Sequence, residues 1–255
     1  KYLNRLRKRD VLMKRLILLS IAAVLLLLGC DRAKTVLFRS YITIYYYSKN
    51  IQLKITDDGN IAIYKEYTSE NVNIKTASYS FKSKGEEKKR YDELCKIHND
   101  MSYNQKRSYI VAPLWGRCSA IDFKEIDVIS DKDFDSEHPA GTSLKDIVRF
   151  VSISPKKFID SGYKETFNWR RNKPKIFKKE SMISSMFHEE TENYFPINGL
   201  LKDIGKDEMQ MLPEDTHGIL FFDKEPTAEK EHTLTVTIDI GERKKLVRTI
   251  KKVFK

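Results

Sequence analysis

Strict alternation of apolar and polar residues is the feature that most constrains the fold of this 255-residue chain. Residues 233–240 read Thr-Leu-Thr-Val-Thr-Ile-Asp-Ile, a glycine-containing turn follows at 241–243, and residues 246–253 return in an apolar-rich run. Successive side chains of a strand point to opposite faces, so this pattern predicts a strand with one buried face. We expect residues 233–253 to form a hairpin that packs against a core.

The same alternation appears earlier in the chain. Residues 42–46 and 51–55 alternate, and Asp57-Asp58-Gly59-Asn60 separates the second run from Ile61 and Ile63. An Asp-Gly step between two alternating runs is typical of a β-hairpin. Residues 123–129 and 219–222 are further strand candidates, the latter fully apolar and therefore buried.

Helical signals are few and short. Residues 86–98 place Tyr91, Leu94, Cys95 and His98 on one stripe at helical spacing. Ser143-x-x-Asp146 resembles a capping box for a helix ending near residue 150, and Ser154-Pro155 is a typical helix start with Gly162 near its end. We also expect a broken helix over residues 200–212.

Many short strands with little long helix predict a mainly β fold with short helices. We divide the chain into residues 1–29, which are excluded from the folded part, a hairpin and helix region over 30–117, and a carboxy-terminal domain over 118–255. We expect the last domain to be antiparallel and sandwich-like, in the manner of immunoglobulin domains.

The amino-terminal segment is very basic and then very apolar. Met13 is followed by Lys14 and Arg15 and by thirteen residues, 16–28, whose only polar member is Ser20. A helix of that length spans about 20 Å, whereas the hydrocarbon core of a bilayer is about 30 Å thick. A basic start and a short apolar stretch are typical of a secretory signal peptide. Residues 1–12 precede the first methionine, and we interpret them as an upstream extension.

The apolar stretch ends in Leu27-Leu28-Gly29-Cys30, which resembles the lipobox of bacterial lipoproteins. The resemblance implies that the Cys30 thiol takes a diacylglycerol, that cleavage before it frees an amine, and that a further chain such as palmitate is added there. Two or more buried acyl chains hold a protein stably at a membrane. We therefore expect a cell-envelope protein, either on a periplasmic face or on the outer-membrane surface. The alternative is an uncleaved short membrane helix with an incidental cysteine.

The net charge of +11 gives little support to a nucleic-acid partner. Residues 1–29 hold seven basic side chains and one acidic one, which contributes +6 and leaves +5 for the remainder. Nucleic-acid-binding domains usually carry a stronger positive charge that is focused on one face. We therefore expect that nucleic acid is not a partner of this protein.

Two cysteines remain after Cys30. Cys95 and Cys118 are an even pair in a chain that we expect to be exported. A disulfide between them would stabilise the fold by about 3 kcal/mol in the chain-entropy model. The alternative is two buried free thiols, because sequence does not supply the required geometry.

A second resemblance covers roughly residues 118–255. Ile126 to Ser130, an acidic Asp133-Phe134-Asp135 loop, His138-Pro-Ala-Gly-Thr-Ser-Leu144 and His232-Thr-Leu-Thr-Val236 are similar to a family of lipoproteins of Bacteroides-type bacteria whose function is unknown. The terminal turn departs from that pattern by reading Gly241-Glu242. The resemblance implies an envelope location and a β-rich fold, and it implies no reaction.

Two segments are candidates for binding a ligand. Asp131, Asp133 and Asp135 alternate like the start of a calcium loop, but Ser136 and Thr142 replace the glycine and glutamate of an EF-hand. Trp169 beside Arg170 and Arg171 resembles an aromatic and cationic surface for an acidic glycan, a lipid head group or a phosphate chain. The plainer interpretations are a solvated turn and a basic loop with the tryptophan tucked inward. We predict no metal site and no cofactor.

The residue patterns contain no recognisable catalytic set. Ser154-x-x-Lys157 matches S-x-x-K of penicillin-recognising enzymes without the other motifs of that class. His188-Glu189 begins like a zincin helix but lacks the second histidine. We expect a non-enzymatic, lipid-anchored module that binds an envelope protein or glycan. The alternatives are an envelope hydrolase with a dispersed site at Asp131, Asp135 and His138, and a structural component without a ligand.

Overall fold

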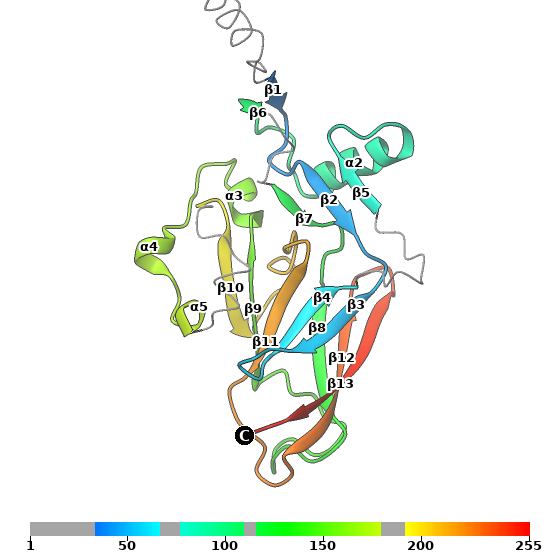
Figure 1. The fold of residues 1–255 in the computed structure, drawn as a ribbon, viewed down its shortest axis with the longest axis vertical. Coiled ribbons are helices and arrows are strands. Elements are labelled where there is room, and N and C mark those ends of the chain that lie inside the picture. Colours follow the sequence, from blue (N-terminus) through cyan, green and yellow to red (C-terminus); the bar gives the residue numbers. More distant parts are fainter. Residues whose placement is uncertain (1–33, 67–76, 110–115, 180–191) are drawn as a thin grey trace, which may run out of the picture. The chain divides into compact units, whose positions relative to one another are not determined.

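A computed structural model describes residues 34–66, 77–109, 116–179 and 192–255. The chain divides into two units, one of residues 1–37 and 106–113 and the other of residues 38–105 and 114–255. The described strands at the first unit are β1 (Lys34–Phe38) and β6 (Gln105–Tyr109), which pair into a two-stranded ribbon. The second unit holds the other strands and all the described helices (Figure 1).

The largest sheet has five strands in the order β10-β9-β11-β4-β3, all antiparallel. Its members are β3 (Ile51–Ile55), β4 (Ile61–Lys65), β9 (Val148–Ser154), β10 (Phe195–Leu200) and β11 (Thr216–Phe222). The hairpin β3–β4 confirms the Asp-Gly prediction. It adds strands from the first half of the chain to a sheet from the second half, so residue 118 does not begin a separate domain.

A second sheet, β13-β12-β8, faces the first across the core. It consists of β8 (Glu125–Ser130), β12 (Glu231–Asp239) and β13 (Lys245–Val253), and β12–β13 is the predicted terminal hairpin. One hydrophobic cluster takes side chains from both sheets, among them Ile63, Phe150, Val128 and Val236. Full burial of one such side chain stabilises a fold by about 1.5–3 kcal/mol. The predicted mainly β, antiparallel and sandwich-like fold is confirmed.

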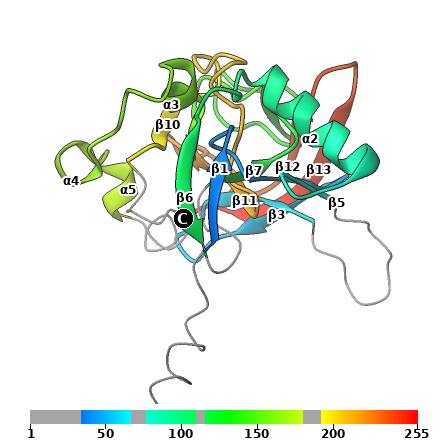
Figure 2. The ribbon, with the colours of Figure 1, turned by 90° about the horizontal axis from the view of Figure 1, so that it is seen from above.

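A smaller sheet, β5-β2-β7, supports the main helix. It contains β2 (Ile44–Tyr47), β5 (Ala77–Ser80) and β7 (Arg117–Ser119), and β2 and β7 run parallel. Helix α2 (Gly85–Ile97) lies beside this sheet (Figure 2). Its predicted stripe of Tyr91, Leu94, Cys95 and His98 is buried throughout.

The other helices among the described residues are α3 (Lys156–Asp160), α4 (Trp169–Asn172) and α5 (Ile176–Lys179). Helix α3 confirms the Ser-Pro start. The helices predicted at residues 143–150 and 200–212 are wrong, because strand β9 begins at Val148 and the second segment is a series of turns.

No helix in the described ranges has both the length and the apolar character needed to cross a bilayer. The apolar stretch 16–28, Cys30 and His188 lie outside the described residues.

Candidate functional site

Residues 131–147 connect β8 to β9, and the acidic side chains of this loop bind backbone groups. Asp131 Oδ1 accepts a hydrogen bond from the Thr233 amide at 2.7 Å, and Asp133 Oδ1 accepts one from the Ala140 amide at 2.7 Å. Asp135 Oδ1 accepts from two amides further along its own turn at 2.9 Å each. The three aspartates of the predicted ligand loop thus serve different donors, and the calcium-loop interpretation gains no support from their arrangement.

His138 lies between two carboxylates and is almost fully buried. Its Nδ1 is 2.7 Å from Asp135 Oδ1 and its Nε2 is 2.9 Å from Asp146 Oδ1. Burial is the largest influence and lowers the pKa of His138, but the hydrogen bonds and charges of both aspartates outweigh it and raise that pKa overall. Burial raises the pKa of each aspartate in turn, and the interactions with His138 more than offset this and lower it. The three side chains form an ion triad.

This geometry bears directly on the dispersed hydrolase site. Asp135 and His138 come together as that hypothesis requires, whereas Asp131 binds the start of β12 instead. A histidine that acts as a general base needs a free ring nitrogen within reach of the proton it removes. Both nitrogens of His138 are hydrogen-bonded to carboxylates, so the triad holds the loop together and is not arranged as a base.

The predicted aromatic and cationic surface does not form around Trp169. The indole is 9% exposed, its Nε1 donates to the Tyr194 carbonyl at 3.0 Å, and its ring packs edge-on against Phe167 and Phe177. Arg170 and Arg171 are exposed on α4. The tryptophan is tucked inward as the plainer interpretation expected, but the segment that was expected to be a loop contains α4 and α5.

Cys95 and Cys118 are both free and buried, which contradicts the predicted disulfide. Tyr45, the cross-strand neighbour of Cys118, packs its ring against Tyr91 and His98 of α2. Aromatic packing rather than a covalent bond therefore joins this sheet to the helix. Burial raises the pKa of Cys95 to about 11 and that of Cys118 well above its usual value, so both remain protonated at neutral pH.

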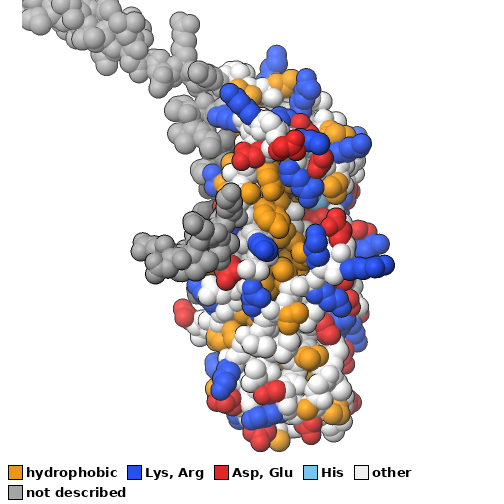
Figure 3. Space-filling model, turned by 90° about the vertical axis from the view of Figure 1, so that its right-hand side faces the viewer, with side chains coloured by type: hydrophobic (Ala, Val, Ile, Leu, Met, Phe, Trp, Pro, Cys, Tyr) orange, Lys and Arg blue, Asp and Glu red, His pale blue; other side chains and the backbone are white. Residues whose placement is uncertain are grey.

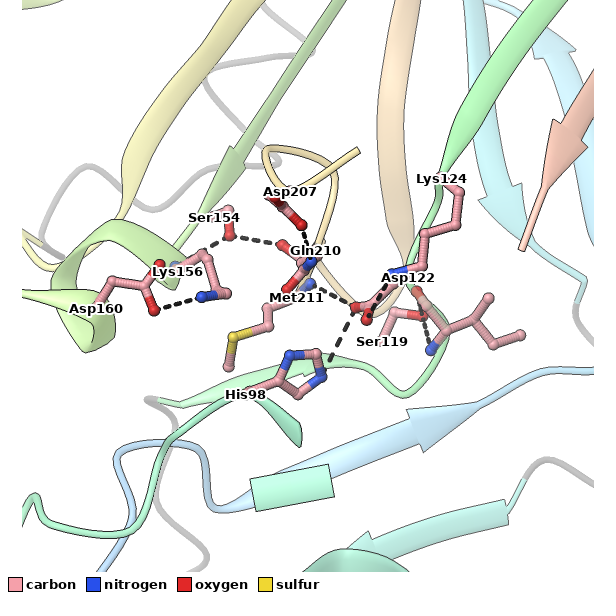
Figure 4. Close-up of polar contacts among 11 residues, drawn as sticks. His98, Ser119, Asp122, Lys124, Ser154, Lys156, Asp160, Asp207, Gln210 and Met211 are labelled. Atoms are coloured by element: carbon pink, nitrogen blue, oxygen red, sulfur yellow. Dashed lines mark hydrogen bonds and ion pairs between the residues drawn. The ribbon is translucent and has the colours of Figure 1, made fainter. Parts of the chain in front are cut away.

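The structure also assembles a buried polar cluster that sequence reasoning missed. His98 at the end of α2 is 1% exposed, and its Nε2 lies 3.7 Å from Asp122 Oδ1, beyond hydrogen-bond distance (Figure 4). Neither ring nitrogen has a hydrogen-bond partner in the part of the chain that is described. Burial, with the nearby lysines, lowers the pKa of His98, while Asp122 and Gln210 act to raise it.

A neutral imidazole beside a carboxylate is chemically suited to proton transfer. His98 is enclosed, however, by the stacked ring of Tyr45 and by the turn that carries Gln210 and Met211 (Figure 4). A substrate does not reach it in this arrangement. His98, Asp122 and Gln210 are far apart in the chain and belong to no motif, so no local signal indicated that they would meet.

Ser154 and Lys157, the two residues of the S-x-x-K match, bind different partners. Ser154 Oγ donates to the Gln210 carbonyl at 2.6 Å, and Lys157 points to Glu165 with a nitrogen–oxygen distance of 3.3 Å. Ser154 Oγ also accepts a hydrogen bond from the Lys156 amide at 3.1 Å, at the start of α3. The hydroxyl thus has a structural role, and the lysine is not its base.

Comparison of the chain with protein-family models, with curated proteins and with solved structures finds no match.

Proposed function

We propose that this protein is a lipid-anchored component of a bacterial cell envelope and that its β-rich domain is a binding module. The observation that carries the anchor is the position of Cys30, directly after Gly29 and an apolar stretch too short to span a bilayer. The first described strand, β1, begins at Lys34 and therefore follows the anchor closely in sequence. Such a protein displays its domain at a membrane surface.

The surface of the folded unit supports a role in binding. Figure 3 shows a band of hydrophobic side chains with lysine, arginine and acidic side chains on both sides of it. Among the described residues of the second unit, large hydrophobic side chains are exposed at Tyr47, Ile55, Ile97, Met101, Val247 and Val253. Contiguous apolar surface with a charged border is typical of protein interaction sites. We therefore favour a protein partner in the envelope over a glycan.

Replacement of Cys30 tests the anchor. In bacteria fed an alkyne fatty acid, we expect the wild-type chain to take up the label, to fractionate with membranes and to begin at Cys30 by mass spectrometry. Cys30→Ser removes the acylated sulfur, so the label and the membrane association should be lost. Cys95→Ser is the matched control and should keep both. A native product with an unmodified Cys30 sulfur, or with the leader still attached, contradicts the proposal.

Photo-crosslinking in cells tests the binding surface. A photoreactive residue in place of Val247, which is 48% exposed on β13, should give one product of defined mass. Strand β13 begins on the right-hand side in Figure 1, the side that Figure 3 faces, and runs toward the marked carboxy terminus, whereas α4 lies on the left. The same residue at Arg170 on α4 is the control and should give no such product. Equal yields at both positions, or no product at Val247, would argue against a partner on this face.

A further inference from the structure

The loop around His138 brings together three side chains that are able to ligate a metal ion. One ligand atom from each of Asp135, Glu137 and His138 lies within 4.8 Å of the other two. No other such group of three occurs among the residues that the structure describes. We propose that these residues form a binding site for a first-row divalent cation of the Zn²⁺ type, with one nitrogen and two carboxylate ligands.

The surroundings of the imidazole favour this assignment. A metal-bound histidine almost always donates its second ring N–H to a carboxylate or carbonyl, which orients the ring. Asp146 Oδ1 occupies that position at 2.9 Å from Nε2 of His138, and the other ring nitrogen, Nδ1, is hydrogen-bonded to Asp135, the second proposed ligand. Asp146 comes from outside the ligand group, at the far end of the loop. Asp146 therefore corresponds to the carboxylate that orients the histidine in a carboxylate–histidine–metal arrangement, and it is not itself a ligand.

Two of the three ligands are already held in place. Asp135 is bound by the amides of Glu137 and His138, and His138 is held by Asp146. Metal–ligand bonds of about 2.0–2.2 Å place two ligands of one ion roughly 3 Å or more apart. The 2.7 Å contact between Nδ1 and Oδ1 has to widen slightly, and the proton that the two atoms share leaves to solvent as the metal enters.

The third ligand has to move, and its surroundings allow it. The Glu137 side chain is 73% exposed, and its one ion pair within the described part of the chain is with Lys224 at 3.6 Å. Exposed pairs of this kind contribute little to stability, so the lysine is readily released. Rotation of Glu137 toward His138 completes a three-ligand set, and water fills the remaining positions of the ion.

The donor set selects the class of metal. Imidazole suits zinc, nickel, copper and iron, whereas calcium prefers six to eight oxygen ligands. The site offers one nitrogen, and Asp131 and Asp133, which would be needed for an oxygen-rich calcium site, are bound to amides elsewhere. We therefore expect Zn²⁺ and Co²⁺ to bind and Ca²⁺ not to compete.

The experiment is a Co²⁺ titration of the full chain, purified in detergent and freed of metal with a chelator. We expect one equivalent of Co²⁺ to produce visible absorption bands that Zn²⁺ abolishes and Ca²⁺ leaves unchanged. Glu137→Gln removes an exposed ligand without disturbing the core and should weaken Co²⁺ binding by about tenfold or more. Asp146→Asn should weaken it by about 10- to 100-fold through the orientation of His138, although Asp146 does not touch the metal.

Two matched variants separate this site from chance binding. Glu229→Gln removes an exposed acid that pairs with Lys132, and His188→Ala removes a histidine with a glutamate next to it in sequence. Both should bind Co²⁺ like the wild type, and circular dichroism should show all four variants folded. The proposal is overturned if no saturable equivalent binds, if Glu137→Gln and Asp146→Asn bind as tightly as the wild type, or if His188→Ala alone abolishes binding.

Discussion

Asp100→Ala is expected to destabilise the protein by about 3–5 kcal/mol. The Asp100 side chain is fully buried, and its two oxygens accept hydrogen bonds from the amides of Tyr41 and Ile42 at 2.7 and 2.8 Å and from the hydroxyl of Tyr163 at 2.9 Å. Removing the carboxylate leaves two buried amides and the part-buried Tyr163 hydroxyl without this acceptor, and each buried donor left unsatisfied costs about 1–3 kcal/mol. Urea denaturation of the purified full chain measures the loss.

The matched control is Asp92→Ala, which removes an exposed carboxylate of α2 that pairs with Lys88, and it should change stability by less than about 0.5 kcal/mol. Burial raises the pKa of Asp100, although its three hydrogen bonds act to lower it. The pKa of Asp100 is therefore higher in the folded than in the unfolded protein, where it is about 3.9. The contribution of the protonated Asp100 to the free energy of unfolding is fully present below that unfolded pKa, and it is lost as pH rises through the folded pKa. Asp100→Asn should lack this dependence. Equal losses for the Asp92 and Asp100 variants would contradict the assigned role.

Gly116→Ala is expected to prevent stable folding or to cost more than about 3 kcal/mol. Gly116 has φ +67°, and its carbonyl accepts from the Thr43 amide at 2.7 Å. An added Cβ would lie 2.1 Å from the carbonyl oxygen of Tyr41, which is backbone and has little room to move. Left-handed strain of about 1–2 kcal/mol adds to that clash. The measurement is the midpoint of thermal or urea unfolding.

Gly162→Ala isolates the contribution of the clash. Gly162 also has φ +67°, but an added Cβ there would meet nothing within 4 Å. Its alanine variant should therefore show only the backbone strain, about 1–2 kcal/mol. If both variants lose the same stability, the close approach between Gly116 and Tyr41 is not what requires the glycine.

The failed helix prediction at Ser143 shows how pairing overrides a local signal. Ser143 and Asp146 have the spacing of a capping box, yet the Ser143 hydroxyl donates to Asp127 at 2.6 Å and Ser143 bridges to Ile129 of β8. The Leu144 amide then donates to the Val128 carbonyl at 2.8 Å. These bonds to β8 replace those that a helix would make, and Asp146 is left to bind His138.

The candidate sites were predicted less well than the strands for a related reason. The sequence placed an aromatic side chain among cations at Trp169, but whether an indole faces solvent depends on Phe167, Phe177 and the Tyr194 carbonyl. The predicted disulfide between Cys95 and Cys118 was wrong, because an even number of cysteines does not supply the geometry of a bridge, and both thiols are free and buried. Composition near a residue does not say which way its side chain points.

The sequence alone determined the mainly β character, the β3–β4 hairpin at the Asp-Gly turn, the terminal β12–β13 hairpin and the buried stripe of α2. The reason is that an apolar period of two residues marks the buried face of a strand, and a period of 3.6 residues marks that of a helix. Only the tertiary structure decided what covers those faces. The pairing of β4 with β11, the Asp100 contacts with Tyr41 and Ile42, and the placement of His138 between two aspartates follow from packing. Periodicity marks a surface for burial, whereas the partner is chosen by the shape and the hydrogen-bonding needs of groups that are distant in the chain.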